Sequence, residues 1–423
     1  MADLRVKFCG IESPNPFWLA SGPPANTAGQ VMRAFEAGWG GAVWKTIGDP
    51  IVNTSSRYGA IDYNGAKVMG LNNIELISDR PIETNFREIA EVKKRWPNHA
   101  VVASLMVDTR ERWHEFMQRS ADAGADGVEL NFGCPHGMSE RGMGASVGQV
   151  PEYTEMIAGW VKEAAKIPVI VKLTPNVTDI TKVARAAERA GADAVSLINT
   201  INSVMSVDLD TFAPTPNVGG RSSHGGYCGP AVKPIALHLV SSVAKAVKIP
   251  IVGIGGITYW NDAAEHIALG SSCVQVCTAV MHYGFRIVED MAEGLSQYMD
   301  EHGFRSIEDF RGRAVRNVVD WGDLDLNYKV IADIDSALCI GCQLCYVACE
   351  DGAHQCIAPY GVAGNGKKNP NGMGVHVPRI IEDECVGCNL CALVCPVQHC
   401  ITMREIDTGK APQSWNQRVR AAD

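Results

Sequence analysis

The sequence predicts an α/β protein of two domains: a (β/α)₈ TIM barrel over residues 1–304 and a small cysteine-rich domain over residues 331–423, joined by a connector at 305–330. Three observations support this prediction. Residues 17–299 alternate short apolar runs with longer segments of helical periodicity, the pattern of successive βα units around a parallel sheet. The tetrapeptide Ala-Gly-Ala-Asp recurs at 123–126 and 190–193. Eight cysteines near the C-terminus form two runs with identical spacing.

Eight apolar runs are expected to be the barrel strands, and they are bounded by residues 17–21, 42–46, 101–106, 128–131, 168–173, 194–199, 251–255 and 274–278. Predicted helices between them include 82–96, 109–123, 152–165, 179–190 and 261–269. A glycine follows several of the predicted helices, at Gly38, Gly124, Gly191 and Gly270. A glycine in the left-handed conformation before a buried strand is typical of the αβ turn in a barrel. An open doubly wound sheet is the alternative, but eight units favour closure.

Each cysteine run reads C-x-x-C-x-x-C-x-x-x-C, which is the spacing of small ferredoxin-like folds that hold two 4Fe-4S clusters. In such folds the fourth cysteine of each run ligates the other cluster. The two predicted ligand sets are therefore Cys339, Cys342, Cys345 and Cys395, and Cys385, Cys388, Cys391 and Cys349. Structural zinc and disulfides are alternatives, although zinc favours paired C-x-x-C motifs with a long spacer and disulfides require an oxidising compartment.

Composition and charge narrow the possible partners and location. The 423 residues are 46% hydrophobic, which supports a large core, and their formal net charge is −9. No basic stripe is present, which argues against a nucleic-acid partner. The first residues lack the apolar segment of a signal peptide, and no apolar run is long enough for a transmembrane helix. We therefore expect a cytoplasmic protein without a membrane partner.

Polar residues collect at the C-terminal ends of the predicted strands, where TIM barrels place their chemistry. Lys45 and Lys172 lie inside strands that are buried on both faces, so each needs a negative partner at the barrel mouth. A flavin would provide one, and the glycine-rich 253–257 turn with Thr278 would hold its phosphate. A glycine pair in a βα turn can also be purely steric.

The loop after the fourth predicted strand, residues 131–144, is rich in glycine and suited to be a lid over the barrel mouth. Cys134 stands at its base and could donate a proton to a carbon as hydride arrives on the neighbouring carbon. The alternative is an inert buried cysteine. His136 could instead serve as the acid or base, or only hydrogen-bond the substrate or the loop.

These features resemble a known family over nearly the whole chain. The chain resembles the pyrimidine-reducing half of dihydropyrimidine dehydrogenase, specifically its separate bacterial flavin subunit. The resemblance is carried by segments 15–21, 73–78, 134–138 and 172–180 and by both cysteine runs. The barrel alone also resembles class 1 dihydroorotate dehydrogenases, which share segment 306–312 and the Cys-Pro of the lid. Those enzymes usually carry asparagine where His136 stands, and the fused cluster domain favours pyrimidine reduction. Gly133 departs from the serine of the eukaryotic enzymes.

The resemblance implies FMN, two 4Fe-4S clusters and reduction of uracil or thymine to the 5,6-dihydropyrimidine, or the reverse. Cys134 would be the general acid that protonates C5. Substrate contacts would come from Asn73, Asn131, His136, Asn199 and Thr200. FMN contacts would come from Ala20, Ser21, Lys45, Thr46, Ser104, Asn131, Lys172, Gly229, Gly255, Gly256, Thr278 and Ala279.

The sequence has no G-x-G-x-x-G between a predicted strand and helix, which argues against a Rossmann site for NAD(P)H or FAD in this chain. The resemblance implies that a second subunit, with FAD, a nicotinamide site and its own clusters, supplies the electrons. Two other functions remain open at this point. One is a dihydroorotate dehydrogenase-like enzyme with a fused ferredoxin outlet, and the other is an electron-transfer module whose barrel only holds the flavin.

Overall fold

The computed structural model describes residues 2–422 except 61–68, 136, 360–362 and 369–373. It divides into two compact units, Met1–Val318 and Val319–Asp423. In the described part of the chain, no helix has both the length and the apolar character needed to cross a bilayer.

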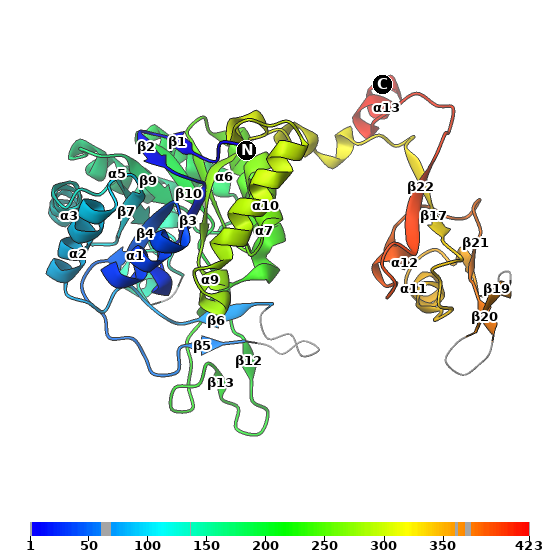
Figure 1. Ribbon diagram of the computed structural model, residues 1–423, viewed down its shortest axis with the longest axis horizontal. Helices are drawn as coiled ribbons and strands as arrows, with labels where there is room; N and C mark the ends of the chain where they lie inside the picture. Colours follow the sequence, from blue (N-terminus) through cyan, green and yellow to red (C-terminus); the bar gives the residue numbers. More distant parts are fainter. Residues whose placement is uncertain (1, 61–68, 136, 360–362, 369–373, 423) are drawn as a thin grey trace. The chain divides into compact units, whose positions relative to one another are not determined.

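The larger unit is a closed parallel barrel with strand order β10-β15-β16-β3-β4-β7-β8-β9 (Figure 1). Its strands are β3 (Phe17–Leu19), β4 (Gly41–Ile47), β7 (Ala100–Leu105), β8 (Gly127–Asn131), β9 (Val169–Lys172), β10 (Ala194–Leu197), β15 (Ile251–Ile254) and β16 (Ser271–Val276). Every residue of these strands is buried, because the barrel interior covers one face and the helices cover the other. The predicted TIM barrel is confirmed, and all eight predicted strands overlap the observed ones.

Helices surround the strands (Figure 1). They are α1 (Ala28–Ala37), α2 (Ile82–Arg95), α3 (Arg110–Asp122), α4 (Ala145–Gly148), α5 (Pro151–Glu163), α6 (Ile180–Arg189), α7 (Lys233–Ala246), α8 (Trp260–Ala268), α9 (Thr278–Tyr283) and α10 (Ile287–Glu301). Short polar side chains begin several of them: Thr27 accepts a hydrogen bond from the Gln30 amide, and Asp179 accepts one from the Thr181 amide. Gly38 and Gly270 both have φ of 114°, as expected for the predicted αβ turns.

An N-terminal hairpin, β1 (Val6–Phe8) and β2 (Ile11–Ser13), lies at the end of the barrel where the strands begin. The Ile11 side chain reaches Gly127 and is fully buried, so a Cβ at Gly127 would lie 3.0 Å from its Cδ1 atom. The hairpin therefore helps close the end opposite to the strand C-termini, and the open end remains for binding.

A four-stranded sheet was not predicted from the sequence, and it lies at the other end of the barrel (Figure 1). Its order is β11-β14-β6-β5, with β5 (Tyr58–Gly59), β6 (Leu71–Asn73), β11 (Ile201–Ser203) and β14 (Gly225–Cys228). These strands come from the connections that follow β4 and β10. A hairpin of β12 (Ser206–Val207) and β13 (Pro214–Thr215) extends the second connection. The barrel mouth is thus partly covered by sheet.

The smaller unit is built from antiparallel strand pairs and short helices around a core that includes seven buried cysteines. Its elements are β17 (Lys329–Ile334) paired with β22 (Ile401–Ile406), β18 (Ile357–Ala358) with β21 (Arg379–Ile380), β19 (Ala363–Lys368) with β20 (Gly374–His376), and the helices α11 (Leu344–Gly352), α12 (Leu390–Leu393) and α13 (Trp415–Ala422). Within the predicted connector the chain forms three 3₁₀ turns, η4 (Ile307–Asp309), η5 (Val315–Asn317) and η6 (Trp321–Asp323).

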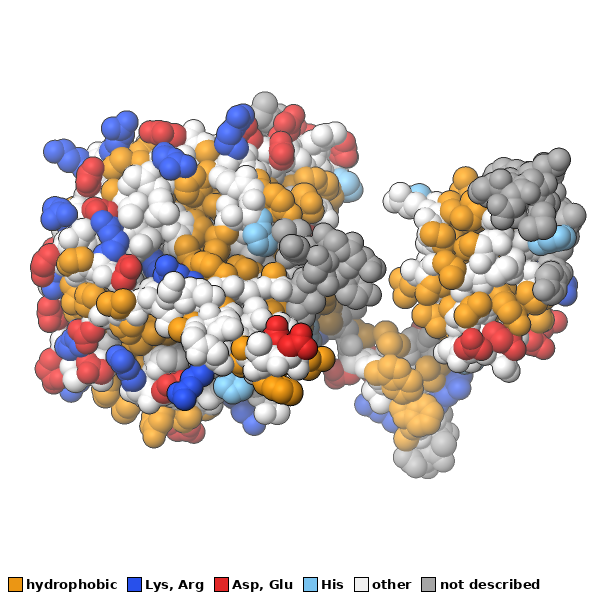
Figure 2. All heavy atoms as spheres, turned by 90° about the horizontal axis from the view of Figure 1, so that it is seen from below, with side chains coloured by type: hydrophobic (Ala, Val, Ile, Leu, Met, Phe, Trp, Pro, Cys, Tyr) orange, Lys and Arg blue, Asp and Glu red, His pale blue; other side chains and the backbone are white. Residues whose placement is uncertain are grey.

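The two surfaces differ in character on the face seen in Figure 2. Charged side chains of both signs are interspersed over the larger unit, whereas hydrophobic side chains cover much of the smaller one (Figure 2). Exposed apolar residues of the smaller unit include Ile340, Leu344, Val386 and Leu393.

Candidate active site

A cavity of about 920 Å³, including its open mouth, lies at the C-terminal ends of the barrel strands and beneath the four-stranded sheet. Eleven of the predicted site residues line it, and they are Ala20, Lys45, Asn73, Lys172, Asn199, Thr200, Gly229, Gly255, Gly256, Thr278 and Ala279. They come from eight different strands or the turns that follow them, so the fold brings together residues far apart in the sequence.

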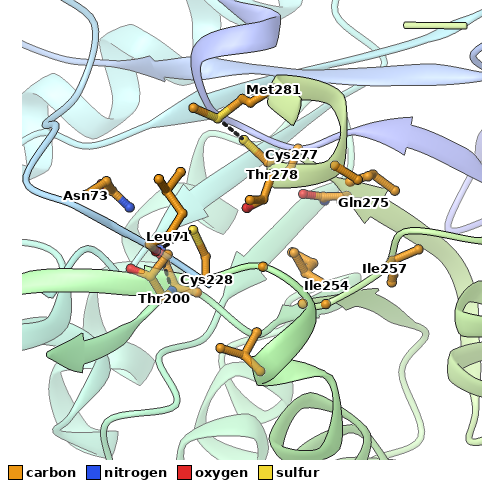
Figure 3. Close-up of a pocket in the computed structure, with 18 of the residues that line it drawn as sticks. Leu71, Asn73, Thr200, Cys228, Ile254, Ile257, Gln275, Cys277, Thr278 and Met281 are labelled. Carbon is orange, nitrogen blue, oxygen red and sulfur yellow. Dashed lines mark hydrogen bonds between the residues drawn. The ribbon is translucent and has the colours of Figure 1, made fainter. Parts of the chain in front are cut away.

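The close-up of the cavity shows two groups of side chains that face a common space (Figure 3). Asn73 and Cys228 come from the covering sheet, whereas Gln275 and Thr278 come from the end of β16 and the start of α9. Gly226 of β14 holds the first group together, because its carbonyl accepts a 3.0 Å hydrogen bond from the Asn73 amide. A Cβ at Gly226 would lie 2.0 Å from Thr200 Oγ1, so the strand must approach Thr200 without a side chain.

Lys45 is buried at the edge of the cavity and forms a salt bridge with Glu75, in which Nζ lies 2.5 Å from Oε1. The two side chains are 7% and 9% exposed. Tyr58 of β5 donates its hydroxyl proton to the other Glu75 oxygen. Burial, together with this bond and the Glu75 charge, raises the pKa of Tyr58. A carboxylate from the covering segment is thus a negative partner of Lys45 in the structure, and the flavin contact of this lysine stays a prediction.

Lys172 also has a carboxylate partner on the chain. Its Nζ lies 3.5 Å from Oε1 of Glu129, which is a fully buried residue of β8. The other Glu129 oxygen accepts hydrogen bonds from Ser196, at 2.8 Å, and from Gln275, at 2.7 Å. Glu129 thus orients both Lys172 and Gln275, which line the cavity, although it does not line the cavity itself.

Four predicted residues lie behind the cavity wall in a connected set of hydrogen bonds. Thr46 Oγ1 lies 3.1 Å from Ser21 Oγ and 2.9 Å from Ser104 Oγ, and it accepts a 2.9 Å bond from the Asn131 amide. The Asn131 carbonyl oxygen accepts a 3.1 Å bond from the Asn199 amide. These four residues therefore lie next to the cavity and orient Asn199. The residues that line the cavity do not include Ser21, Thr46, Ser104 or Asn131.

Cys134 is 9% exposed and packs in a small apolar cluster with Ile77, Met106 and Met138. Its carbonyl accepts a 3.0 Å hydrogen bond from the amide of Ala145 at the start of α4, which ties down the base of the lid. It is not among the residues that line the cavity, but Leu76, which does line it, packs against the same cluster. His136 lies outside the described residues.

The glycine turns at the cavity have conformations that favour glycine, since φ is 98° at Gly229, 119° at Gly255 and 75° at Gly256. Packing also restricts this turn, because a Cβ at Gly256 would lie 2.5 Å from the backbone nitrogen of Lys233. Behind it, Nε2 of the fully buried His266 lies 3.2 Å from the Gly255 carbonyl oxygen. Burial lowers the pKa of His266 to about 4, which keeps the ring neutral near pH 7.

Several lining residues were missed by the sequence analysis: Tyr58, Glu75, Tyr227, Cys228, Gln275 and Cys277. Gln275 could have been predicted from the sequence, because it is a polar residue within a buried apolar strand. Cys277 directly precedes the predicted Thr278, and burial raises its pKa to about 12. No sequence pattern pointed to Tyr58, Tyr227 or Cys228, because they belong to the covering sheet, which was not predicted.

The cysteine runs form two further cavities in the smaller unit. One, of about 310 Å³, is lined by Cys339, Cys342, Cys345 and Cys395, and the other, of about 330 Å³, is lined by Cys349, Cys385, Cys388 and Cys391. The grouping is that of the two predicted ligand sets. Among the described residues no three Cys, His, Asp or Glu side chains converge closely enough for a single metal ion. Four thiols in each cavity, from runs with this spacing, suit a 4Fe-4S cluster.

Comparison with known proteins agrees with this division of the chain. Residues 3–299 match the family model described as "Dihydroorotate dehydrogenase", and residues 332–403 match the "4Fe-4S dicluster domain". The NAD-dependent dihydropyrimidine dehydrogenase subunit PreA of Escherichia coli is 40% identical over 408 residues, which is 96% of each chain. The chain belongs to the PreA family of dihydropyrimidine dehydrogenase subunits.

Other relatives of this PreA-family chain share the barrel. The chloroplastic dihydropyrimidine dehydrogenase (NADP(+)) of Arabidopsis thaliana is 42% identical over 76% of this chain and 79% of its own length. The catalytic subunit of dihydroorotate dehydrogenase B (NAD(+)) from Thermococcus kodakarensis is 38% identical over 74% of this chain and 99% of its own. The crystal structure of the Eimeria tenella dihydroorotate dehydrogenase with ferulenol has a TM-score of 0.61 and 19% identity, covering 73% and 88% of the two chains, and it supports the fold alone.

Proposed function

We propose that the chain reduces uracil or thymine to the 5,6-dihydropyrimidine, and catalyses the reverse, with FMN in the barrel cavity and two 4Fe-4S clusters in the smaller unit. The observation that carries this proposal is that one chain has a strand-end cavity lined by paired lysines and amides, and also two cavities lined by five cysteines each, four of which are a predicted ligand set. The PreA relationship supports the pyrimidine substrate and an NAD-linked electron source. We also propose the predicted boundaries at 1–304, 305–330 and 331–423 as the limits of the two domains and the connector.

The residues that line the barrel cavity fit a flavin in their chemistry. Lys45 and Lys172 bring buried positive charge to its wall, and the turns at Gly229 and Gly255 let the backbone approach a ligand closely. FMN bound here would supply the hydride for C6 of the pyrimidine. The lysines would face the flavin ring, whereas Gly229, Gly255, Gly256, Thr278 and Ala279 would hold its phosphate.

The amide groups of the cavity support a neutral diketo heterocycle as the substrate. Asn73, Asn199 and Thr200 offer donors and acceptors together, as the carbonyl and NH edges of uracil require. Among the described lining residues the only cations are Lys45 and Lys172, and both already face carboxylates. The carboxylate of orotate would find no unpaired cation among them. This observation favours uracil or thymine over the dihydroorotate dehydrogenase alternative.

Cys134 is the proposed proton donor to C5. Its place at the base of the lid, beside the cluster that reaches the cavity through Leu76, supports this role. His136 is proposed to contact the substrate from the same loop. Asn131 supports the site indirectly, since it holds Asn199 in place.

Electrons are proposed to arrive from a partner subunit that carries FAD and a nicotinamide site, and to pass through the two clusters to FMN. The sequence lacks the glycine fingerprint of a Rossmann site, so the chain itself would not oxidise NAD(P)H. The proposal predicts that the isolated chain reduces uracil with an artificial one-electron donor but not with NADH.

The decisive experiment is anaerobic purification of the full chain, followed by flavin, iron and sulfide analysis and by titration with uracil, thymine and orotate. We expect FMN, about eight irons per chain, and an absorbance change with uracil or thymine. Robust turnover with NADH alone would contradict the partner proposal. Orotate binding tighter than uracil binding would instead support the dihydroorotate dehydrogenase alternative.

A further inference from the structure

Each cysteine-lined cavity contains a fifth cysteine that the proposed ligand sets do not use. Cys356 lines the cavity of Cys349, Cys385, Cys388 and Cys391, and Cys400 lines the cavity of Cys339, Cys342, Cys345 and Cys395. Both are buried. Four thiolates complete the coordination of a 4Fe-4S cluster, so one thiol remains in each cavity without a role.

The position of Cys356 is defined by contacts with one ligating residue. Its Sγ atom lies 3.5 Å from Sγ of Cys349, and its backbone amide donates a 3.4 Å hydrogen bond to the same sulfur. Its carbonyl accepts a 2.8 Å bond from the amide of Ile381. The side chain also interacts with Cys385, the first cysteine of the second run.

Cys400 occupies the equivalent place in the other half of the unit. Its carbonyl accepts a 2.8 Å hydrogen bond from the amide of Asp335, and its side chain interacts with Cys395 and Cys339. Asp335 lies four residues before Cys339, and Ile381 lies four residues before Cys385. The Cys339 amide donates a 2.9 Å hydrogen bond to the Asp335 carbonyl, and the Cys385 amide donates a 3.0 Å bond to the Ile381 carbonyl. The carbonyl of the fifth cysteine therefore has the same partner position in both cavities. The Cys400 amide differs from that of Cys356, because it donates to the Val397 carbonyl, and the Cys400 thiol lies 3.8 Å from the Asp335 carbonyl oxygen, to which it donates.

Both fifth cysteines also begin a strand, since Cys356 directly precedes β18 and Cys400 directly precedes β22. Each touches the first cysteine of one run and the fourth of the other, so it bridges the two segments that form its cavity. A buried cysteine that served only as a small apolar filler would not need sulfur-to-sulfur contacts in both halves.

We propose that Cys356 and Cys400 each donate the thiol proton to a ligating sulfur of the neighbouring cluster and thereby raise its reduction potential. This inference rests on the proposed function, because it assumes that the two cavities hold 4Fe-4S clusters. A thiolate ligand has lone pairs but no proton, whereas the fifth thiol has one proton to donate. Hydrogen bonds to cluster sulfurs stabilise the more negative, reduced state and are a main determinant of cluster potential. Cys356 and Cys400 are thus positioning residues and not ligands.

The test uses the full chain, purified anaerobically, in wild-type form and as Cys356→Ala, Cys356→Ser, Cys400→Ala and Cys400→Ser. Each cluster is followed by EPR during a potentiometric titration. In each alanine variant the reduced-to-oxidised ratio of one cluster should fall roughly threefold to tenfold at a fixed potential. The other cluster should keep its wild-type ratio. The serine variants retain a donor and should restore most of the shift.

A second measurement needs no variant: ENDOR on the reduced wild-type chain should show, at each cluster, a proton coupling from the thiol that disappears after exchange into D₂O. Alanine variants that keep full iron and unchanged ratios would overturn the inference. Loss of half the iron in both the alanine and the serine variant would also overturn it, because the fifth cysteine would then be a ligand. A wild-type chain without iron would instead overturn the proposed function itself.

Discussion

At the scale of single residues, the buried charges of the barrel determine most of the site. Lys45 and Lys172 form ion pairs next to the cavity with Glu75 and Glu129, which come from different parts of the chain. A buried pair adds little net stability, but removal of one partner is costly because the other charge stays buried. These pairs hold the lysines at the cavity wall.

Glu129→Gln should therefore leave Lys172 without its carboxylate. We expect the free energy of unfolding to fall by about 3 kcal/mol, measured by urea denaturation, together with weaker FMN retention. The control is Glu163→Gln, which removes an exposed pair with Arg110 and should leave the free energy of unfolding nearly unchanged. Equal effects of the two substitutions would contradict the role given to Glu129.

Cys134→Ala should lower uracil reduction by roughly 10²- to 10⁴-fold, the usual contribution of a positioned acid. Steady-state turnover with an artificial donor measures this loss. FMN and iron content should stay at the wild-type level, which separates a missing proton donor from a misfolded chain. Cys9→Ala is the control, since Cys9 precedes β2 at the opposite end of the barrel. Unchanged turnover in Cys134→Ala would favour the electron-transfer module.

His266 gives the barrel a pH-dependent stability. Its pKa is lowered by burial from 6.5 to about 4, so the unfolded chain binds a proton between these values that the folded chain does not. The stabilisation is complete above pH 6.5 and decreases as the pH falls toward 4, by about 3 kcal/mol in total. Urea midpoints measured from pH 8 to 5 should therefore decline less steeply in His266→Gln than in the wild type. Parallel slopes would contradict this assignment.

At the scale of elements, the regular part of the fold was predictable and the inserted part was not. The barrel strands are continuous apolar runs between amphipathic helices, so their order and approximate limits follow from periodicity. The strands β5, β6, β11 and β14 have two to four residues each, too few for a periodic signal. Their pairing depends on contacts between distant segments, and Glu75 and Cys228 of the site were missed for this reason.

Gly226→Ala tests how the covering sheet holds the substrate groups. A Cβ there would overlap Thr200 and disturb the carbonyl that binds Asn73. We expect the KM for uracil to rise roughly tenfold, corresponding to the loss of about one hydrogen bond, with a smaller effect on kcat. Gly159→Ala in α5 is the matched control, because a Cβ there meets nothing within 4 Å. A KM unchanged in Gly226→Ala would show that the sheet does not position these residues.

At the scale of the whole molecule, two units divide the proposed chemistry between them, and the cysteine spacing alone predicted which residues share each cavity of the smaller unit. The cysteine spacing could predict this grouping because four ligands around one iron-sulfur cluster restrict the conformation of the chain strongly. It could not assign Cys356 and Cys400, which lie outside the repeated motif.

Cys388→Ala should remove one ligand of a single cluster. We expect the iron content to fall from about eight to about four per chain, measured chemically, and electron delivery from a partner to stop. Uracil binding, followed by the flavin absorbance change, should persist because the barrel cavity belongs to the other unit. Retention of all the iron would contradict the predicted ligand sets.

The sheet over the barrel mouth has an evolutionary consequence. The barrel strands form one side of the cavity, and the sheet on the connections after β4 and β10 forms the other, so a substitution in that sheet leaves the barrel strands unchanged. Substitutions in the covering sheet alone could therefore alter which heterocycle is bound, while the residues of the barrel strands stay the same. Swapping those two connections between relatives should accordingly transplant substrate preference.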